Sequence, residues 1–246
     1  MLDHDIDLVA QEAWADQVET GSRMIFLQDA GVFPRTGGNA FEQSSIGYIL
    51  NQAGAQRSVV IYEPDMSEYT DAAYVASSSV YEGGTVAWSN YQLTGAPKTK
   101  SVDGTPLTAS DYSALAANNI NFLQNQGGVW VVREGKAIGG EWIDIIRGRD
   151  LLEDNITVAA RNYLLSKKGS KVPYTQAGMQ ESAGVVDGEL QRAVASGFLT
   201  AYTVTVPDRA DVPLTNVAAR FFDGITFEGT LAGAITTISV SGTLSY

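Results

Sequence analysis

The stretch GGEWIDIIRGRDLLEDNITVAARNYLLS, residues 139–166, decides the fold of the second half of the chain. Its short apolar part, residues 142–146, predicts a strand after the turn at Gly139 and Gly140. From 150 to 166 apolar residues recur at helical spacing, which predicts the longest helix of the chain. The apolar stripe of this helix consists of Leu152, Ile156, Ala159 and Tyr163.

The residues that follow predict a second long helix and three strands. Pro173 interrupts the chain, Thr175 is a typical helix cap, and Gly197 ends the helix. Its predicted apolar stripe consists of Met179, Ala183, Val186, Leu190 and Val194. Alternation of apolar and polar residues then predicts strands at 202–206, 221–227 and 234–244. We expect the two helix stripes to share one core.

Before this stretch the chain alternates between helical and strand patterns. We predict helices at 5–18, 44–53 and 67–80 and strands at 24–27 and 58–62. Such alternation favours a small α/β layer with parallel strands. A βα unit normally begins with its strand, so we expect that a first strand and an N-terminal arm precede the sequence given.

The middle of the chain contains breakers and then a short helix and a hairpin. Residues 83–106 are rich in glycine and proline and predict a boundary region. Thr108 and Asp111 predict a capped helix to residue 117, and strands at 120–124 and 129–134 are joined at Gly127-Gly128. We therefore predict an α/β part (1–82), a linker (83–106) and a C-terminal domain (107–246). The expected fold class is α/β (α+β), with mixed β-sheets flanked by helices.

Composition excludes several kinds of site. The 246 residues include no cysteine, one histidine (His4) and a formal net charge of -12. Thiolate chemistry, cysteine–histidine zinc sites and histidine-based triads are thereby excluded, and a nucleic-acid-binding role is disfavoured. No run approaches eighteen apolar residues, so we expect no membrane partner and a soluble protein made in a cytosol. We predict no cofactor, no metal and no catalytic residue.

Two motifs suggest chemistry but have structural interpretations. Gly135, Gly139 and Gly140 lack the strand-then-helix context of a dinucleotide fingerprint, and we interpret them as a hairpin turn. The densest acidic stretch comprises Glu141, Asp144, Asp150, Glu153 and Asp154. A glycosidase needs two carboxylates held across a cleft, which spacing alone does not establish. A carboxylate hydrolase therefore stays open as an alternative.

The end of the chain carries no charge after Glu228. In this run Ile238, Val240 and Leu244 alternate with polar residues, as in a strand with a flat and uncharged edge. One interpretation is a central strand paired on both sides within its own domain. The other is that a neighbouring chain completes the sheet by strand addition.

Several segments resemble phage tail sheath proteins of the contractile type. They are residues 139–153, VPYTQAG at 172–178, VTVP at 204–207, AAR at 218–220 and FEGTLAGAI at 227–235, with a looser match at NNIN, 118–121. Any one of them is weak, and their order and spacing carry the resemblance.

The resemblance implies a structural subunit of a virion tail, assembled in the host cytoplasm. Such subunits pack as rings around the tail tube, stack helically and drive contraction, with other sheath subunits, the tube protein and the baseplate as partners. Terminal arms of neighbouring subunits add strands to the C-terminal sheet. The residues expected to take part in strand addition are Ile235, Thr237, Ser239, Val240 and Ser241. A tail-associated hydrolase and a monomeric binding module are the alternatives.

Overall fold

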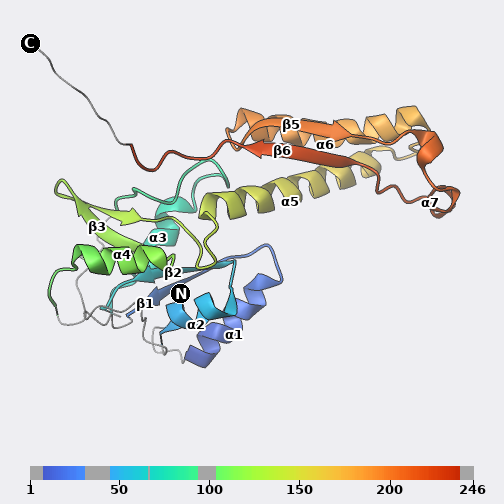
Figure 1. The fold of residues 1–246 in the computed structure, drawn as a ribbon. Helices are drawn as coiled ribbons and strands as arrows, with labels where there is room; N and C mark the ends of the chain where they lie inside the picture. Colours follow the sequence, from blue (N-terminus) through green and yellow to red (C-terminus); the bar gives the residue numbers. More distant parts are fainter. Residues whose placement is uncertain (1–7, 31–44, 66, 94–103, 239–246) are drawn as a thin grey trace, which may run out of the picture. The chain divides into compact units, whose positions relative to one another are not determined.

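The structure is a computed structural model that describes residues 8–30, 45–65, 67–93 and 104–238. It is a mixed α+β protein with small sheets, so the predicted fold class is confirmed (Figure 1). The chain forms two compact units. The first contains the described residues of Met1–Glu82, Val86–Arg147 and Ile235–Tyr246, and the second contains Gly83–Thr85 and Gly148–Ala234.

A parallel pair of strands lies at the centre of the first unit. β1 (Ile25–Asp29) pairs with β2 (Ser58–Tyr62) in the register Ile25 to Ser58. The helices are α1 (Leu8–Glu19), α2 (Ile46–Ala53) and α3 (Thr70–Ser78). Ser45 caps the start of α2 and Gly54 ends it in the left-handed conformation. The predicted alternation of helices and parallel strands is therefore confirmed.

The next elements extend the same unit. They are α4 (Ala109–Ala117), β3 (Phe122–Gln126) and β4 (Val129–Arg133). Thr108 and Asp111 form the predicted capping box, and Gly127 and Gly128 both have the positive φ of the predicted hairpin turn. Asn121, just before β3, bridges to Ile61 of β2 in parallel. Residues 86–147 pack with the first unit. The boundary between the compact units therefore differs from the predicted linker at 83–106.

β2 is fully buried because its two faces contribute to two different cores. Val60 and Tyr62 face a core that includes Ala15 of α1, Leu50 of α2 and Leu115 of α4. Val59 and Ile61 face the other core, with Tyr74 of α3, Trp88, Ile143 and Ile146. A parallel strand covered on both faces reads as a continuous apolar run, as SVVIY does.

The predicted strand at 142–146 is wrong, because α5 (Ile143–Ser166) already begins there. Only Trp142 pairs, in an isolated antiparallel bridge to Lys136 across the predicted glycine turn. Ile143 and Ile146 lie three residues apart and are both buried in the second core, which matches helical geometry. A short apolar run does not distinguish strand from helix by its pattern alone.

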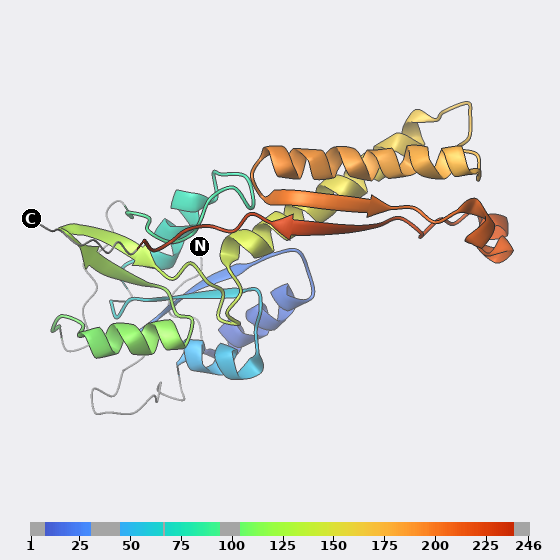
Figure 2. The ribbon, with the colours of Figure 1, turned by 45° about the horizontal axis from the view of Figure 1, so that its top comes forward.

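The second unit contains the rest of α5 and α6 (Gln176–Ala195), with Thr175 as the predicted cap of α6. β5 (Leu199–Thr205) runs alongside α6 and pairs with β6 (Thr226–Leu231) (Figure 2). A short 3-10 helix, η1 (Arg209–Asp211), and α7 (Leu214–Ala219) lie between the two strands. The core consists of Val186, Leu190, Ala193, Phe198 and Leu199, against which Leu152, Ile156 and Val194 pack. The predicted shared core of the two helices is confirmed for these stripe residues, whereas Ala159, Tyr163, Met179 and Ala183 of the predicted stripes are not part of it.

The last two predicted strands require correction. Between α7 and β6, residues 221–225 form no strand, so the strand predicted at 221–227 begins only at Thr226. Of the strand predicted at 234–244, residues 234–238 are irregular and the remainder lies outside the described residues.

Candidate functional site

The β5–β6 sheet is two-stranded within the described residues. The register places Val204 opposite Phe227 and Tyr202 opposite Gly229, so the side chains of Tyr202, Val204 and Phe227 share one face. Tyr202 and Val204 pack against the core of the second unit. The opposite face carries Thr203, Thr205, Thr226 and Glu228, all exposed. The sheet thus has one face on the helices and one face in solvent.

Each strand of this sheet has an edge that no described strand covers. Every residue of β6 is exposed, and neither lysine nor proline interrupts it. Natural proteins usually protect such an edge with charge, proline or a bulge. The register shift at Leu199–Ala201 lies on β5. The β6 edge carries only Glu228 as a charged side chain.

The segment after β6 contains the predicted strand-addition residues. Ala232 donates its N–H to the carbonyl oxygen of Phe198, and beyond it residues 233–238 form no strand. Ile235 is 85% exposed and Ile238 80% exposed, and Thr237 is exposed as well. Asn90 holds the segment through a 3.0 Å hydrogen bond to the carbonyl oxygen of Thr236. Ser239, Val240 and Ser241 lie outside the described residues.

These exposures matter energetically. Burying an isoleucine side chain contributes about 1.5–3 kcal/mol. Leaving both Ile235 and Ile238 exposed therefore loses a free energy that is large beside the net stability of a domain. Net backbone hydrogen bonds add about 0.5–1.5 kcal/mol each when an edge is paired. An uncovered sheet edge and an apolar, unpaired segment are the two components that strand addition requires.

The acidic stretch considered for hydrolysis lies before and along α5. Asp144 is in its first turn, and burial raises the pKa of this carboxyl above its usual range. Glu153 and Asp154 are exposed further along the helix. The described residues contain no group of three or more histidine or carboxylate side chains placed to hold a metal ion. Of these carboxylates, Glu141 is close enough to Asp144 for its charge to contribute to the raised pKa of Asp144.

Sequence reasoning missed two buried carboxylates in the first unit. Asp29 ends β1 and Glu63 follows β2, so both lie at the carboxyl ends of parallel strands. Asp29 Oδ2 accepts a 2.9 Å hydrogen bond from the N–H of Gly47, and Glu63 Oε1 accepts one of 3.2 Å from Asp65. Because both carboxylates directly follow buried strands, their position in the sequence could have identified them. The contacts shown hold the start of α2 and the turn after β2 in place.

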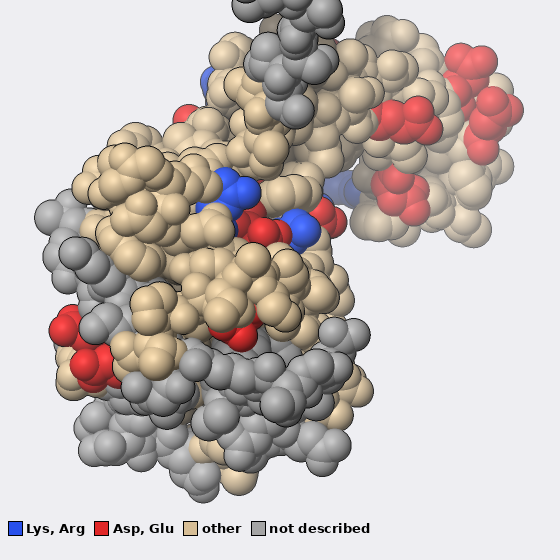
Figure 3. Space-filling model, turned by 60° about the vertical axis from the view of Figure 1, so that its left-hand side comes forward, with Lys and Arg blue, Asp and Glu red and all other residues tan. Residues whose placement is uncertain are grey.

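One face of the molecule shows how the basic side chains are distributed. On the face drawn in Figure 3, the lysine and arginine side chains of the described residues form small groups mixed with acidic ones. Among the described helices, none combines the length and apolar character that a membrane span requires.

Comparison with known proteins finds the fold rather than a sequence family. No protein-family model matches the chain, and no curated protein matches it. Among solved structures, a chain of the anti-feeding prophage (AFP) baseplate aligns with a TM-score of 0.66 at 15% identity, covering 98% of this chain and 66% of that one. A sheath tail protein from Listeria innocua aligns at 14% identity with a TM-score of 0.48, covering 82% of this chain and 48% of that one.

The chain therefore shares the fold of the aligned chain of the AFP baseplate, and the predicted resemblance is confirmed at the level of the fold. It spans about two thirds of the length of the AFP baseplate chain and about half of the Listeria protein.

Proposed function

We propose that the chain is a non-enzymatic structural subunit of a contractile, phage-type tail. Copies pack as rings around the tail tube and stack helically as a sheath, and the packing changes when the tail contracts. The partners are other copies, the tube protein and the baseplate, and the location is the virion tail, after assembly in the host cytoplasm. The fold likeness supports this assignment, as does the uncovered sheet of the second unit.

One observation carries the proposal. The chain places an uncharged segment with two exposed isoleucines directly after a strand whose every residue is exposed. Both features lower the solubility of an isolated monomer. Copies that exchange strands bury both. We propose that the segment containing Ile235, Thr237, Ser239, Val240 and Ser241 pairs with a strand of a neighbouring copy.

The link is made mainly by backbone groups. Strand addition forms a row of N–H···O=C bonds, and side chains contribute by their alternation between the two faces. Proline removes one donor and fixes φ, so it blocks pairing at its own position. In the described structure Thr237 belongs to no strand, so proline there removes no strand pairing within its own chain.

The test is polymer formation by proline variants. We expect the wild-type chain to form tubes or stacked rings in negative-stain electron micrographs, and Thr237→Pro or Ser239→Pro to abolish them. Thr237→Ala is the matched control, because it keeps the N–H and should assemble. Circular dichroism checks that each variant stays folded. Normal tubes from folded proline variants at both positions would refute strand addition through this segment.

The hydrolase alternative has its own test. The purified chain is assayed on cell-wall and glycoside substrates. Turnover that disappears when Asp144 or Glu153 is changed to the amide would overturn the non-enzymatic assignment. A chain that remains monomeric at every concentration would instead support the binding-module alternative.

A further inference from the structure

One side chain connects the segment after β6 to the rest of the first unit. Asn90 Nδ2 donates a 3.0 Å hydrogen bond to the carbonyl oxygen of Thr236. Among residues 233–238, all of them described, no other group forms a hydrogen bond with the described part of the chain. Thr236 is half-buried, whereas the residues on both sides of it are exposed. The segment is therefore held at this one residue.

The side chain of Asn90 is oriented by its neighbours in β4. The backbone N–H of Asn90 donates to the carbonyl oxygen of Val132 at 2.7 Å, and the N–H of Val132 donates to the carbonyl oxygen of Tyr91. The Arg133 guanidinium donates to Oδ1 of Asn90 at 3.0 Å. A side-chain amide has one acceptor oxygen and one donor nitrogen, so the contact with Arg133 leaves Nδ2 to face Thr236.

The backbone at Asn90 does not by itself call for an amide side chain. Its φ is 62, in the left-handed region. Asparagine tolerates this conformation better than most residues, but glycine adopts it without a steric cost. What asparagine adds over glycine at this turn is the pair of contacts to Arg133 and Thr236.

We propose that Asn90 is a latch that regulates assembly. In a free copy it holds residues 235–238 on that copy's own first unit. In an assembled copy the Asn90–Thr236 bond is open, and the segment pairs with a neighbour. The proposal rests on the proposed function, because it assumes that this segment adds to a neighbouring sheet, and it deepens that function by naming the contact that delays the addition.

The strength of the contact suits a latch that opens. Asn90 is exposed, and one hydrogen bond there changes the equilibrium between held and free segment by about two- to twelve-fold. Ile235 and Ile238 add little apolar burial to the held state, since they are 85% and 80% exposed. Strand addition forms a row of backbone hydrogen bonds, so a correctly placed neighbour outcompetes the single bond. A segment that is free for only a fraction of the time pairs less readily by that fraction.

Asn90→Asp tests the latch by removing the donor while keeping the shape of the side chain. Aspartate tolerates a positive φ and still accepts from Arg133, but its carboxylate has no proton to donate to the Thr236 carbonyl. Tube formation is followed by light scattering and checked in electron micrographs. We expect it to be about two- to twelve-fold faster than for the wild-type chain. Asn90→Gly suits the backbone, adds no charge and should give the same acceleration.

Asn119→Asp is the matched control. Asn119 also has a positive φ, 57, and its Nδ2 donates to a backbone carbonyl, that of Ile138, at 3.1 Å. It forms no hydrogen bond with residues 233–238. This variant carries the same added charge and loses the same kind of bond, so it should not accelerate assembly. Circular dichroism checks that each variant is folded.

A second readout measures the segment without assembly. Nitroxide labels are attached at Val129→Cys and Ile238→Cys, two exposed positions in a chain that has no other cysteine. Pulsed electron paramagnetic resonance of dilute, unassembled chains then gives the distribution of distances between the labels. We expect a narrow distribution when Asn90 is present, a broad one in Asn90→Asp and Asn90→Gly, and no broadening in Asn119→Asp.

The outcomes separate the latch from the proposed function. Tubes that form at the wild-type rate or more slowly in both Asn90 variants would overturn the latch and leave strand addition standing. An unchanged distance distribution in both variants would also overturn it, because the bond would then not hold the segment. If neither the wild-type chain nor any variant forms tubes, the proposed function fails, and the latch fails with it.

Discussion

At the scale of single residues, the side chain of Asn121 connects several backbone segments of the first unit. It is fully buried, and its Nδ2 donates to the carbonyl oxygens of Val60 and Lys136 at 3.0 and 2.9 Å. Its Oδ1 accepts from the N–H groups of Gly135 and Lys136. One amide thus ties β2 to the turn that precedes α5.

We predict that Asn121→Ala lowers the free energy of unfolding by about 3 kcal/mol or more, because several buried backbone groups lose their partner at about 1–3 kcal/mol each. Urea denaturation followed by circular dichroism measures the loss. Asn125→Ala is the control: it removes a single bond to Gly128 in an exposed turn and should cost about 1 kcal/mol or less. Equal losses for both variants would contradict the role of the Asn121 network.

Two glycines of α6 make a second matched pair. Gly178→Ala should destabilise the protein by about 1–3 kcal/mol, because the added methyl group meets the Pro173 carbonyl. At Gly184 an added methyl group would have no atom within 4 Å, so Gly184→Ala should stabilise α6 by about 0.5–1 kcal/mol through helix propensity. Opposite shifts in melting temperature are the expected result. Shifts of the same sign would contradict the close contact at Pro173.

At the scale of elements, the α5–α6 pair depends on Leu190, which is fully buried in the core of the second unit. Leu190→Ala should cost roughly 2–5 kcal/mol. Leu165→Ala is the control on the partner helix, since Leu165 is 68% exposed and its truncation should stay within about 0.5 kcal/mol. Chemical denaturation gives both values. A small loss at Leu190 would place the stripe outside the core.

At the scale of the whole molecule, separate cores predict separate responses to mutation. The first unit has two buried clusters and the second has one small cluster. Leu190→Ala should therefore speed amide hydrogen exchange in α6 and β5 and leave β2 unchanged. Leu123→Ala, in the second core of the first unit, should do the reverse. Exchange that rises uniformly in both variants would mean that the units unfold as one.

Much of the architecture follows from local patterns. The spacing of apolar residues, together with capping residues and glycine turns, located several elements. They are α2, β2, α4 with its capping box, the Gly127-Gly128 hairpin and the paired stripes of α5 and α6. These elements agree with their sequences because caps, turns and apolar faces act within a few residues. The same reasoning located the uncharged segment after β6, although it predicted a strand where residues 234–238 are irregular.

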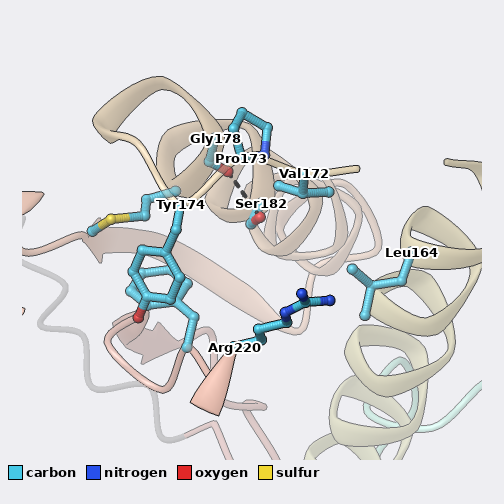
Figure 4. Close-up of a pocket in the computed structure, with 9 residues that line it drawn as sticks. Leu164, Val172, Pro173, Tyr174, Gly178, Ser182 and Arg220 are labelled. Atoms are coloured by element: carbon cyan, nitrogen blue, oxygen red, sulfur yellow. Dashed lines mark hydrogen bonds between the residues drawn. The ribbon is translucent and has the colours of Figure 1, made fainter. Parts of the chain in front are cut away.

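Only the tertiary structure decided the remaining points, because they depend on contacts between distant residues. Residues 143–146 are helical because Ile143 and Ile146 fill one core together, which their short run does not specify. Residues 86–147 pack with the first unit through the Asn121 bridge to β2, across a stretch that reads as a linker. A pocket lined by Leu164, Gly178 and Arg220 (Figure 4) joins separate segments of the second unit, so spacing along the chain gave no sign of it. The sequence by itself determined the class of fold and an uncharged apolar end; packing determined where the helices begin, which segments share a core and which side chains meet.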